Sequence, residues 1–235
     1  MIMDTKKTVY QFLKGTELFR EVPPAMLEEA CASCRITRVK RSRFLYHKGE
    51  IANYLYVLKH GYLMELFSYR ESMEMVVKVK SPGEYFGETA LLTDRNYLNT
   101  AITMEESELV IMPKTVFLKL AWANPGICRV VIQQLVERLT NSAQNMLNSM
   151  YMDAPGRLAF TLINLIPAQS DHSRPREVRI TQQALASTAG MARQTAAMIL
   201  GDWRKRGWIG TDRGRISVLD YDSLMEIIMN SELRC

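Results

Sequence analysis

The residues best suited to metal or redox chemistry are Cys31 and Cys34, which are separated by an alanine and a serine. Cysteines at this spacing can supply two ligands to zinc or to an iron–sulfur cluster, but either site needs further ligands. The other two cysteines, Cys128 and Cys235, are isolated, and the three histidines are scattered. Because free cysteine is commonly a small buried hydrophobe, we expect Cys31 and Cys34 in the core, and no cofactor is firmly implied.

Signatures of catalysis are missing from the sequence. It has no nucleophile elbow, no glycine-rich phosphate loop and no pair of carboxylates at a telling spacing. Cys128 could act as a redox switch only as an exposed thiolate beside a cation, and Arg129 alone is its cationic neighbour in sequence. We therefore expect a binding protein and not an enzyme.

Side chains able to hydrogen-bond with DNA gather between residues 180 and 209. Thr181 is placed to cap a first short helix, which begins at Gln182 and ends near Ala189. Gly190 then provides the backbone freedom of a sharp turn. A second helix is predicted from about Ala192 to Arg206.

The second helix is amphipathic. Its apolar residues recur with helical spacing at Ala196, Ile199, Leu200 and Trp203, and its other side carries Arg193, Gln194, Ala197, Met198 and Gly201. Two short helices around a tight turn are typical of a DNA-binding helix-turn-helix, whose second helix enters the major groove. An ordinary helical hairpin would give the same periodicity.

Charge favours the DNA-binding interpretation. Residues 174–215 hold nine Lys and Arg against Glu177, Asp202 and Asp212, a net charge of +6, whereas the whole chain carries +5. A local basic excess is typical of a surface that contacts phosphate. After the second helix, Trp208 to Val218 predicts a β-hairpin with Arg213 and Arg215 on it. Together these elements predict a winged helix-turn-helix.

The 235 residues suit two modest domains. No apolar run approaches the roughly 18 residues of a membrane span, and the first residues lack the apolar region of a signal peptide. We therefore expect a cytoplasmic protein without a membrane partner.

The first 112 residues change from helical to strand periodicity. Residues 1–34 predict two helices broken at Pro23-Pro24, the second carrying an apolar stripe from Met26 to Cys34. From Arg35 to about Met112, alternation with period two and glycines at 49, 61, 83 and 87 predict an antiparallel barrel. The residues expected on the inward face are Leu55, Val57, Tyr62, Met64, Leu66, Val77 and Val79. The basic run from Arg35 to Arg43 suits a solvated strand, or a contact with flanking DNA or polymerase.

One long helix is predicted from Gly126 to about Met150, where Ile132, Leu135, Leu139, Ser142 and Met146 follow steps of three and four. Such a narrow stripe is typical of a coiled-coil seam, which favours pairing with a second copy. Asp153 as N-cap and Pro155 in the first turn predict a new helix, so a hinge is expected near residues 150–153. Residues 167–177 are expected to be a polar connector.

Several motifs resemble the CRP/FNR superfamily of regulators, over about residues 19–218. His47-Lys-Gly-Glu50 and Pro82-Gly-Glu-Tyr-Phe-Gly-Glu-Thr-Ala-Leu-Leu92 are similar to its cyclic-nucleotide-binding β-roll. Asn124-Pro125 and Asp153-Ala-Pro-Gly-Arg-Leu-Ala159 resemble its helix start and hinge. The resemblance implies an α+β fold with a sensory β-roll domain over 1–123, a long dimerisation helix and hinge over 124–152, and a winged helix-turn-helix domain over 153–235.

The predicted effector site departs from the cyclic-AMP-binding members of that family. The Gly-Glu pair that holds the ribose is present as Gly87 and Glu88, but Leu98 or Asn99 stands where an Arg neutralises the phosphate. A buried phosphate without a cation is costly, so we expect no dependence on cyclic AMP. The resemblance leaves an unknown small-molecule effector as a partner, with candidate contacts at Gly87, Glu88, Thr89, Asn99, Thr100 and Ser142. Ser142 could instead be a polar residue that only fixes register.

The recognition helix departs as well. Its run Arg193-Gln194-Thr195, followed by Met198, matches Arg-Glu-Thr and a later Arg in the cyclic-AMP receptor. Arg193 suits guanine or phosphate, Gln194 suits adenine, and Met198 can offer only apolar contact. We expect a palindrome richer in A·T than the family's TGTGA half-site. The residues expected at the DNA are Thr181, Gln182, Gln183, Arg193, Gln194, Thr195, Met198, Arg213 and Arg215.

We therefore expect a transcription regulator that binds double-stranded DNA as a homodimer, with RNA polymerase as a partner if it activates. The dimer contacts are expected at Ile132, Leu135, Leu139 and Met146. The rival interpretation is a signalling module whose last domain binds protein instead of DNA.

Overall fold

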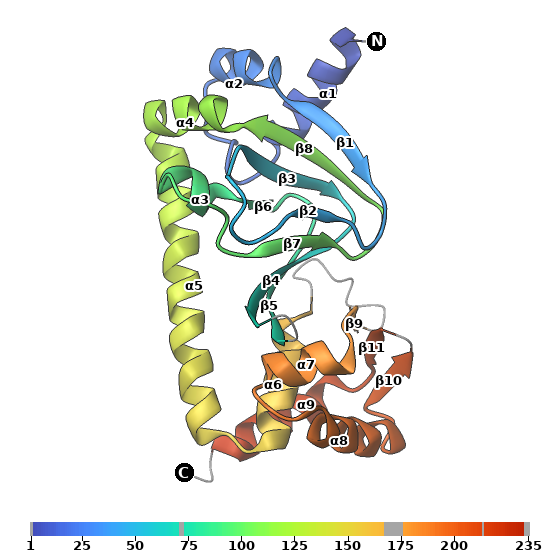
Figure 1. Ribbon diagram of the computed structural model, residues 1–235. Helices are drawn as coiled ribbons and strands as arrows, with labels where there is room; N and C mark the ends of the chain where they lie inside the picture. The colour runs from blue at the N-terminus through green and yellow to red at the C-terminus, as the bar shows by residue number, and fades with distance from the viewer. Residues whose placement is uncertain (1, 71–72, 167–175, 213, 233–235) are drawn as a thin grey trace. The chain divides into compact units, whose positions relative to one another are not determined.

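The computed structural model describes residues 2–70, 73–166, 176–212 and 214–232. The chain forms two compact units, one of Met1–Glu65 with Lys80–Leu139 and one of Leu66–Val79 with Thr140–Cys235. The first carries most of the β-structure, and the second is mainly helical (Figure 1).

The first unit begins with two helices that pack against one end of a β-roll (Figure 1). Helix α1 spans Ile2–Lys14, and α2 spans Pro24–Cys31 with a proline in its first turn. The second helix begins at the Pro23-Pro24 pair as predicted, but α1 ends earlier than predicted, at Lys14. Helix α2 is shorter than predicted, because its last turn closes at Ala32 and the chain enters β1 at Arg35.

Two antiparallel sheets form the roll. One has the strand order β1-β8-β3-β6 and the other β2-β7-β4-β5. The strands of the first sheet are β1 Arg35–Val39, β8 Ser107–Pro113, β3 Tyr54–His60 and β6 Tyr85–Phe86. The strands of the second are β2 Phe44–Tyr46, β7 Thr100–Thr103, β4 Leu63–Arg70 and β5 Met73–Lys80.

Strand β3 lies between β8 and β6 in its sheet, and side chains on both of its faces are buried. Leu55, Tyr56, Val57 and Leu58 are all buried. In the register, Tyr56 lies opposite Ile111 on one side and Phe86 on the other. A strand covered on both faces favours a continuous apolar run, which explains why alternation is weak here.

The phase predicted for β4 is wrong. Leu66 is buried as expected, but Tyr62 and Met64 are only half-buried. The strand instead buries Leu63, with 0% of its surface exposed, and the charged Glu65, with 5% exposed. The sequence pattern predicts Glu65 at the surface, because a carboxylate without a partner is costly to bury.

The phase predicted for β5 is also wrong. Val79 is half-buried, and the side chain of Val77 lies outside the described ones. The buried side chains are those of Val76 and Lys80. Two charged residues, one on each of two adjacent strands, therefore point inward where the hydropathy pattern predicts apolar ones.

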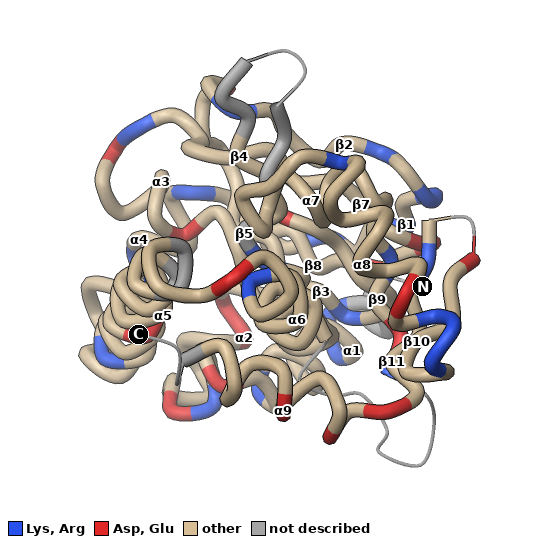
Figure 2. The backbone as a smooth tube through the Cα atoms, turned by 90° about the horizontal axis from the view of Figure 1, so that it is seen from below, with Lys and Arg blue, Asp and Glu red and all other residues tan. Residues whose placement is uncertain are grey.

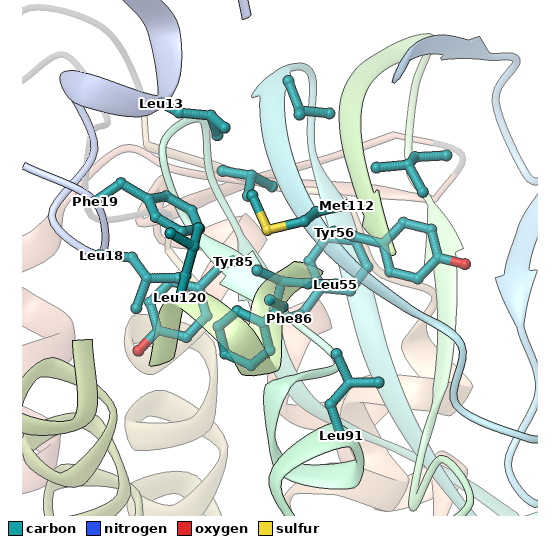
Figure 3. Close-up of a cluster of buried hydrophobic side chains, with 14 of the residues drawn as sticks. Leu13, Leu18, Phe19, Leu55, Tyr56, Tyr85, Phe86, Leu91, Met112 and Leu120 are labelled. Atoms are coloured by element: carbon teal, nitrogen blue, oxygen red, sulfur yellow. The ribbon is translucent and has the colours of Figure 1, made fainter. Parts of the chain in front are cut away.

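The core of the first unit is aromatic and aliphatic (Figure 3). Phe86 stacks on Tyr56 with ring centroids 5.2 Å apart. Phe19 and Leu13 enter from the N-terminal segment, and Leu120 enters from helix α4, Lys114–Ala123. Burial of this apolar surface holds the helices to the roll.

Two turns require glycine. Gly61, with φ +89°, connects β3 to β4, and a Cβ there would collide with the side chain and backbone of Ser107. Gly87, also with φ +89°, precedes helix α3, Glu88–Leu92. These left-handed conformations exclude most side chains. Helix α3 itself was not predicted, because five residues are too short for a periodic signal.

Helix α5 spans Pro125–Tyr151, one residue longer at each end than predicted. Its first turns bury Ile127, Val130 and Val131 in the core of the roll. No single described helix is long and apolar enough to span a membrane. The pair of α4 and Pro125–Gln144 passes on length and composition, but it is bent by 102° and its apolar residues contribute to the roll core.

In the second unit, Asp153 caps helix α6, Ala154–Asn164, as predicted. Its carboxylate accepts the N–H of Gly156 at 2.9 Å and the hydroxyl of Ser231 at 3.0 Å. Ser231 lies on α9, Tyr221–Glu232, which packs against α6. A Cβ on Gly156 would collide with the Ser231 side chain, so this glycine permits the close packing of the two helices.

The segment 176–218 of the second unit contains two helices and three strands among its described residues. Its sheet has the order β10-β11-β9. The predicted hairpin is present, but the predicted connector is wrong at its end, where Arg176–Val178 forms a third strand. Residues 167–175 of that connector lie outside the described residues. The remaining elements are β9 Arg176–Val178, α7 Gln182–Thr188, α8 Arg193–Lys205, β10 Ile209–Asp212 and β11 Arg215–Val218.

Candidate nucleic-acid interface and effector site

Helices α7 and α8 form the helix-turn-helix predicted from the sequence. The Thr181 hydroxyl caps α7 by accepting the N–H of Ala184 at 3.1 Å. Gly190 adopts φ +63° between the helices, a left-handed conformation that favours glycine. The Thr181 cap and the glycine turn are therefore confirmed.

Helix α8 is buried on the predicted face. Ala196, Leu200 and Trp203 have 0 to 2% of their surface exposed, and Ile199 is half-buried. The opposite face is exposed and carries Arg193, Gln194, Ala197 and Met198. Thr195 is half-buried. A partner that approached this face would therefore meet one cation, one amide and one thioether.

The start of α8 is open to a partner. Ala192 occupies the N-cap position and provides no side-chain hydrogen bond. The first N–H groups of a helix have no partner within the helix, and the dipole makes this end attractive to anions. Gln182 and Gln183, in the first turn of α7, are also exposed.

Arg157 connects α6 to this motif. Its guanidinium donates to the carbonyl of Met152 at 2.8 Å and to that of Ala189 at 3.3 Å. Ala189 ends α7 immediately before the Gly190 turn. The guanidinium therefore fixes the turn against the beginning of α6, which the sequence did not predict.

Basic residues follow the segment from α8 into the β10–β11 hairpin (Figure 2). Arg204, Lys205 and Arg206 at the end of α8 are exposed. Arg206 forms an ion pair with Asp202 at 2.8 Å and lies over the Trp208 ring. An exposed ion pair of this kind contributes little to stability, so the cation remains accessible to a stronger anion.

The wing supplies fewer free cations than expected. Arg215, on β11, pairs with Glu177 of β9 at 3.3 Å. Arg213 lies outside the described residues. Arg176 lies over the ring of Tyr221, with its guanidinium carbon 3.8 Å from the centroid. Part of the basic excess is therefore engaged in contacts within the second unit.

In the roll, the predicted effector residue Glu88 is buried, with 2% exposed. Its Oε1 lies 3.0 Å from Nη1 of Arg138 on α5 and accepts the hydroxyl of Thr89 at 3.0 Å. Burial alone would lower the pKa of Arg138, but the carboxylates of Glu88 and then Glu65 outweigh it and raise the pKa. Gly87, Glu88 and Thr89 thus share one corner of the roll.

Asn99 and Thr100 lie on the strand side of this region. Asn99 donates from Nδ2 to Glu65 Oε1 at 2.8 Å and accepts the hydroxyl of Tyr46 at 3.3 Å. The Thr100 hydroxyl accepts the N–H of Lys48 at 3.0 Å. Leu98, by contrast, is 45% exposed, so Asn99 is the one of the two alternative positions that faces inward.

Sequence reasoning missed four residues of this region, namely Glu65, Lys80, Arg138 and Tyr46. Lys80 is fully buried, and its Nζ lies 3.8 Å from Glu65 Oε2. The sequence shows only an acidic residue on one predicted strand and a basic residue on the next. An ion pair at the solvent-exposed surface would give the same pattern. Ser142, the last candidate, is exposed on α5 one turn beyond Arg138.

Helix α5 exposes a long apolar face. All four predicted dimer residues are exposed, from 40% for Leu135 to 72% for Leu139. Further large exposed side chains on the same helix are those of Val136, Leu147, Met150 and Tyr151. The residues that pack on the roll, such as Ile127 and Val131, occupy a different side of the helix.

Of the two cysteines expected in the core, only Cys31 is fully buried. Cys31 is buried, and burial raises its pKa to about 11. Cys34 is half-buried, lies outside α2 and has a pKa raised by burial to about 12. Cys128 donates to the carbonyl of Ala121 at 3.3 Å. Within the described ranges, no three His, Cys, Asp or Glu side chains gather as a metal site.

Comparison with known proteins matches both units. A cyclic nucleotide-binding domain family matches residues 36–124, and a Crp-like helix-turn-helix domain family matches residues 156–227. The "cAMP-activated global transcriptional regulator CRP" of Pasteurella multocida is 30% identical over 177 residues, 74% of this chain and 85% of that protein. A "CRP-like cAMP-activated global transcriptional regulator" of Mycobacterium tuberculosis is 22% identical over 91% of this chain and 97% of its own length.

Solved structures share the fold. A CRP/FNR-family regulator of Eubacterium rectale aligns with TM-score 0.70 and 16% identity, over 90% of this chain and 97% of that one. The "c-di-GMP Responsive Global Regulator CLP" of Xanthomonas campestris aligns with TM-score 0.67 and 20% identity, over 83% and 99% respectively. With the β-roll, the long helix and the helix-turn-helix in the same order, the chain belongs to the CRP/FNR superfamily of transcription regulators.

Proposed function

We propose that this protein binds a palindromic DNA site as a homodimer and regulates transcription there without depending on cyclic AMP. The observation that carries the proposal is the exposed face of α8, where Arg193, Gln194 and Met198 stand beside an uncapped helix start. The proposal includes three parts of the chain, namely a sensory roll over 1–123, a dimerisation helix over 124–152 and a DNA-binding domain over 153–235.

DNA binding is supported by chemistry at the start of α8. Arg193 can donate two hydrogen bonds to guanine O6 and N7, and Gln194 can pair with adenine N6 and N7. Met198, with 73% of its surface exposed, suits contact with a thymine methyl group. The exposed Arg204 and Lys205 supply charge for phosphates. An operator richer in A·T than TGTGA half-sites follows from these side chains.

Pairing with a second copy is supported by α5. Its exposed apolar side chains follow steps of three and four from Ile132 to Met150, and one side of the helix already packs on the roll. A continuous exposed stripe of this kind is normally covered by a partner. A parallel coiled coil would cover it and would place two copies of α8 for half-sites about 34 Å apart.

Independence from cyclic AMP is supported by Leu98 and Asn99, because neither can neutralise a phosphate. The names of related proteins indicate different ligands, because one is called cAMP-activated and another c-di-GMP responsive. An unidentified effector at Glu88, Thr89 and Asn99 would act by shifting a population of conformations across residues 150–153. The setting is cytoplasmic, with RNA polymerase as a further partner if the protein activates.

Binding selection with the purified full-length chain and random duplexes tests the proposal. Enrichment of a palindrome that loses affinity as salt is raised is the expected result. The Arg193→Ala variant should lose binding. Its matched control, Arg20→Ala, changes an exposed arginine between α1 and α2 and should retain binding. Absence of any enriched duplex, with the same chain folded, would favour a module whose last domain binds protein.

A further inference from the structure

The β-roll contains an unusual buried ion pair. Glu65 on β4 has 5% of its surface exposed and Lys80 on β5 has none, and their charged atoms lie 3.8 Å apart. Charged side chains are almost never buried unless they are paired, because removal from water disfavours the charged form. The pair therefore requires further hydrogen bonds to be tolerated.

Those hydrogen bonds come from the predicted effector region. Lys80 Nζ donates to the carbonyl of Tyr85 at 2.9 Å. Glu65 Oε1 accepts from Asn99 Nδ2 at 2.8 Å, and Asn99 Oδ1 in turn accepts the hydroxyl of Tyr46 at 3.3 Å. Burial and the negative charge of Glu65 and then Glu88 raise the pKa of Tyr46 well above its usual range, so its phenol remains a donor.

Another ion pair, Glu88 with Arg138, adjoins the first. Arg138 is influenced by the charges of both Glu88 and Glu65. Two carboxylates and two cations thus share one region of the first unit, and their formal charges cancel with nothing bound. Both cations that could attract an anion, the buried Lys80 and the partly exposed Arg138, already pair with the two carboxylates.

We propose that Glu65 determines the ligand specificity of the roll by excluding phosphate-bearing and other anionic ligands. Its carboxylate holds Lys80 and would repel a phosphate near Asn99. When the charge of Glu65 is removed, Lys80 becomes an unbalanced buried cation, and the same region becomes an anion-binding site. The inference rests on the roll being the regulatory part of the proposed function, but its test involves no DNA.

The experiment compares thermal unfolding of the full-length wild-type chain and its Glu65→Gln variant, with inorganic phosphate and with cyclic AMP. The wild type should show no saturable rise in Tm with either ligand. Glu65→Gln should show a saturable rise, with affinity at least tenfold above any wild-type response. Glu29→Gln is the matched control, because it removes a carboxylate from an exposed ion pair with Lys119. It should behave as the wild type does.

A double variant locates the anion. Glu65→Gln with Lys80→Met removes both charges, so it should fold and lose the response gained by Glu65→Gln. Retention of that response would show that the anion binds away from Lys80, which overturns the proposal. If Glu65→Gln alone does not fold, phosphate should restore its cooperative unfolding transition, and a failure to do so would also overturn it.

Two further outcomes are decisive. If the wild type binds cyclic AMP saturably and as tightly as Glu65→Gln does, then Glu65 does not exclude anionic ligands. A folded Glu65→Gln variant without any anion response would show that Lys80 cannot serve as the cation. Neither result depends on whether the chain binds DNA, so this inference and the proposed function can fail separately.

Discussion

Glu88 Oε1 and Arg138 Nη1 lie 3.0 Å apart, which joins the start of α3 to the middle of α5. The Glu88 side chain is 3% exposed, whereas that of Arg138 is 34% exposed. The contact therefore links the predicted effector region with the helix proposed to form the dimer. A change in the roll that moved Glu88 would act directly on α5.

Removal of this contact should destabilise the first unit. Glu88→Gln leaves Arg138 without its main counterion, and we expect a loss of about 1–3 kcal/mol, below the fully buried range because Arg138 is partly exposed. Urea unfolding of the full-length chain measures the loss. Glu29→Gln, which breaks an exposed pair, should cost less than about 1 kcal/mol. Equal effects of the two variants would contradict the structural role of Glu88.

The exposed face of α5 should hold the dimer together. Leu135→Asp with Leu139→Asp places charges on that face, where like charges would meet across a two-fold axis, so we expect monomers by light scattering. Gln133→Asp with Thr140→Asp adds the same charge at exposed positions beside the face and should leave the dimer intact. A dimer that survives the first pair of substitutions would place the interface elsewhere.

The start of α8 can be stabilised. Ala192 is in an extended conformation at the N-cap, with φ −68° and ψ 145°, but has no oxygen to accept an N–H. Ala192→Ser supplies that oxygen and should stabilise the second unit by about 0.5–1 kcal/mol. Thermal unfolding gives the change. Ala197→Ser, at an exposed position inside the helix, is the control and should be neutral or slightly destabilising.

Cys31 and Cys34 should react slowly with thiol reagents. Burial raises the pKa of Cys31 to about 11, and that of Cys34 to about 12. The reactive thiolate is therefore scarce at pH 8, and alkylation should be on the order of a hundredfold slower in the folded than in the unfolded chain. Mass spectrometry of iodoacetamide-treated protein follows the rates. Rapid labelling of either residue in the folded chain would show an exposed thiolate, which a redox role requires.

Substitutions should distinguish a residue that reads a base pair from one that contacts phosphate. Gln194→Ala should relax the preference at one operator position by about 1–3 kcal/mol, because one side chain reads one base pair. Arg215→Ala should weaken binding to all sequences alike and flatten the salt dependence. Its effect should be small, since Glu177 already pairs with this arginine. Quantitative gel shifts with selected and scrambled duplexes provide both values. Recovery of TGTGA half-sites in the selection would refute the assignment of Gln194.

The sequence alone determined the helix-turn-helix, the cap of α6 and the extent of α5. Thr181, Gly190 and Asp153 act on backbone groups within a few residues, so their effect can be read locally. The apolar spacing of α8 also selects its buried face without reference to distant residues. Glycines at 61 and 87 likewise indicated turns, and both adopt positive φ in the structure.

Only the tertiary structure decided which strand faces point inward and where the charges of the roll lie. Glu65 and Lys80 read as surface residues because hydropathy treats each charge alone. They are buried because β4 and β5 bring opposite charges together and Asn99 and Tyr85 complete their hydrogen bonds. The strand at Arg176–Val178 depends likewise on pairing with β11, far along the chain. A buried charge or a short strand is stabilised by its partners, and those partners exist only after folding.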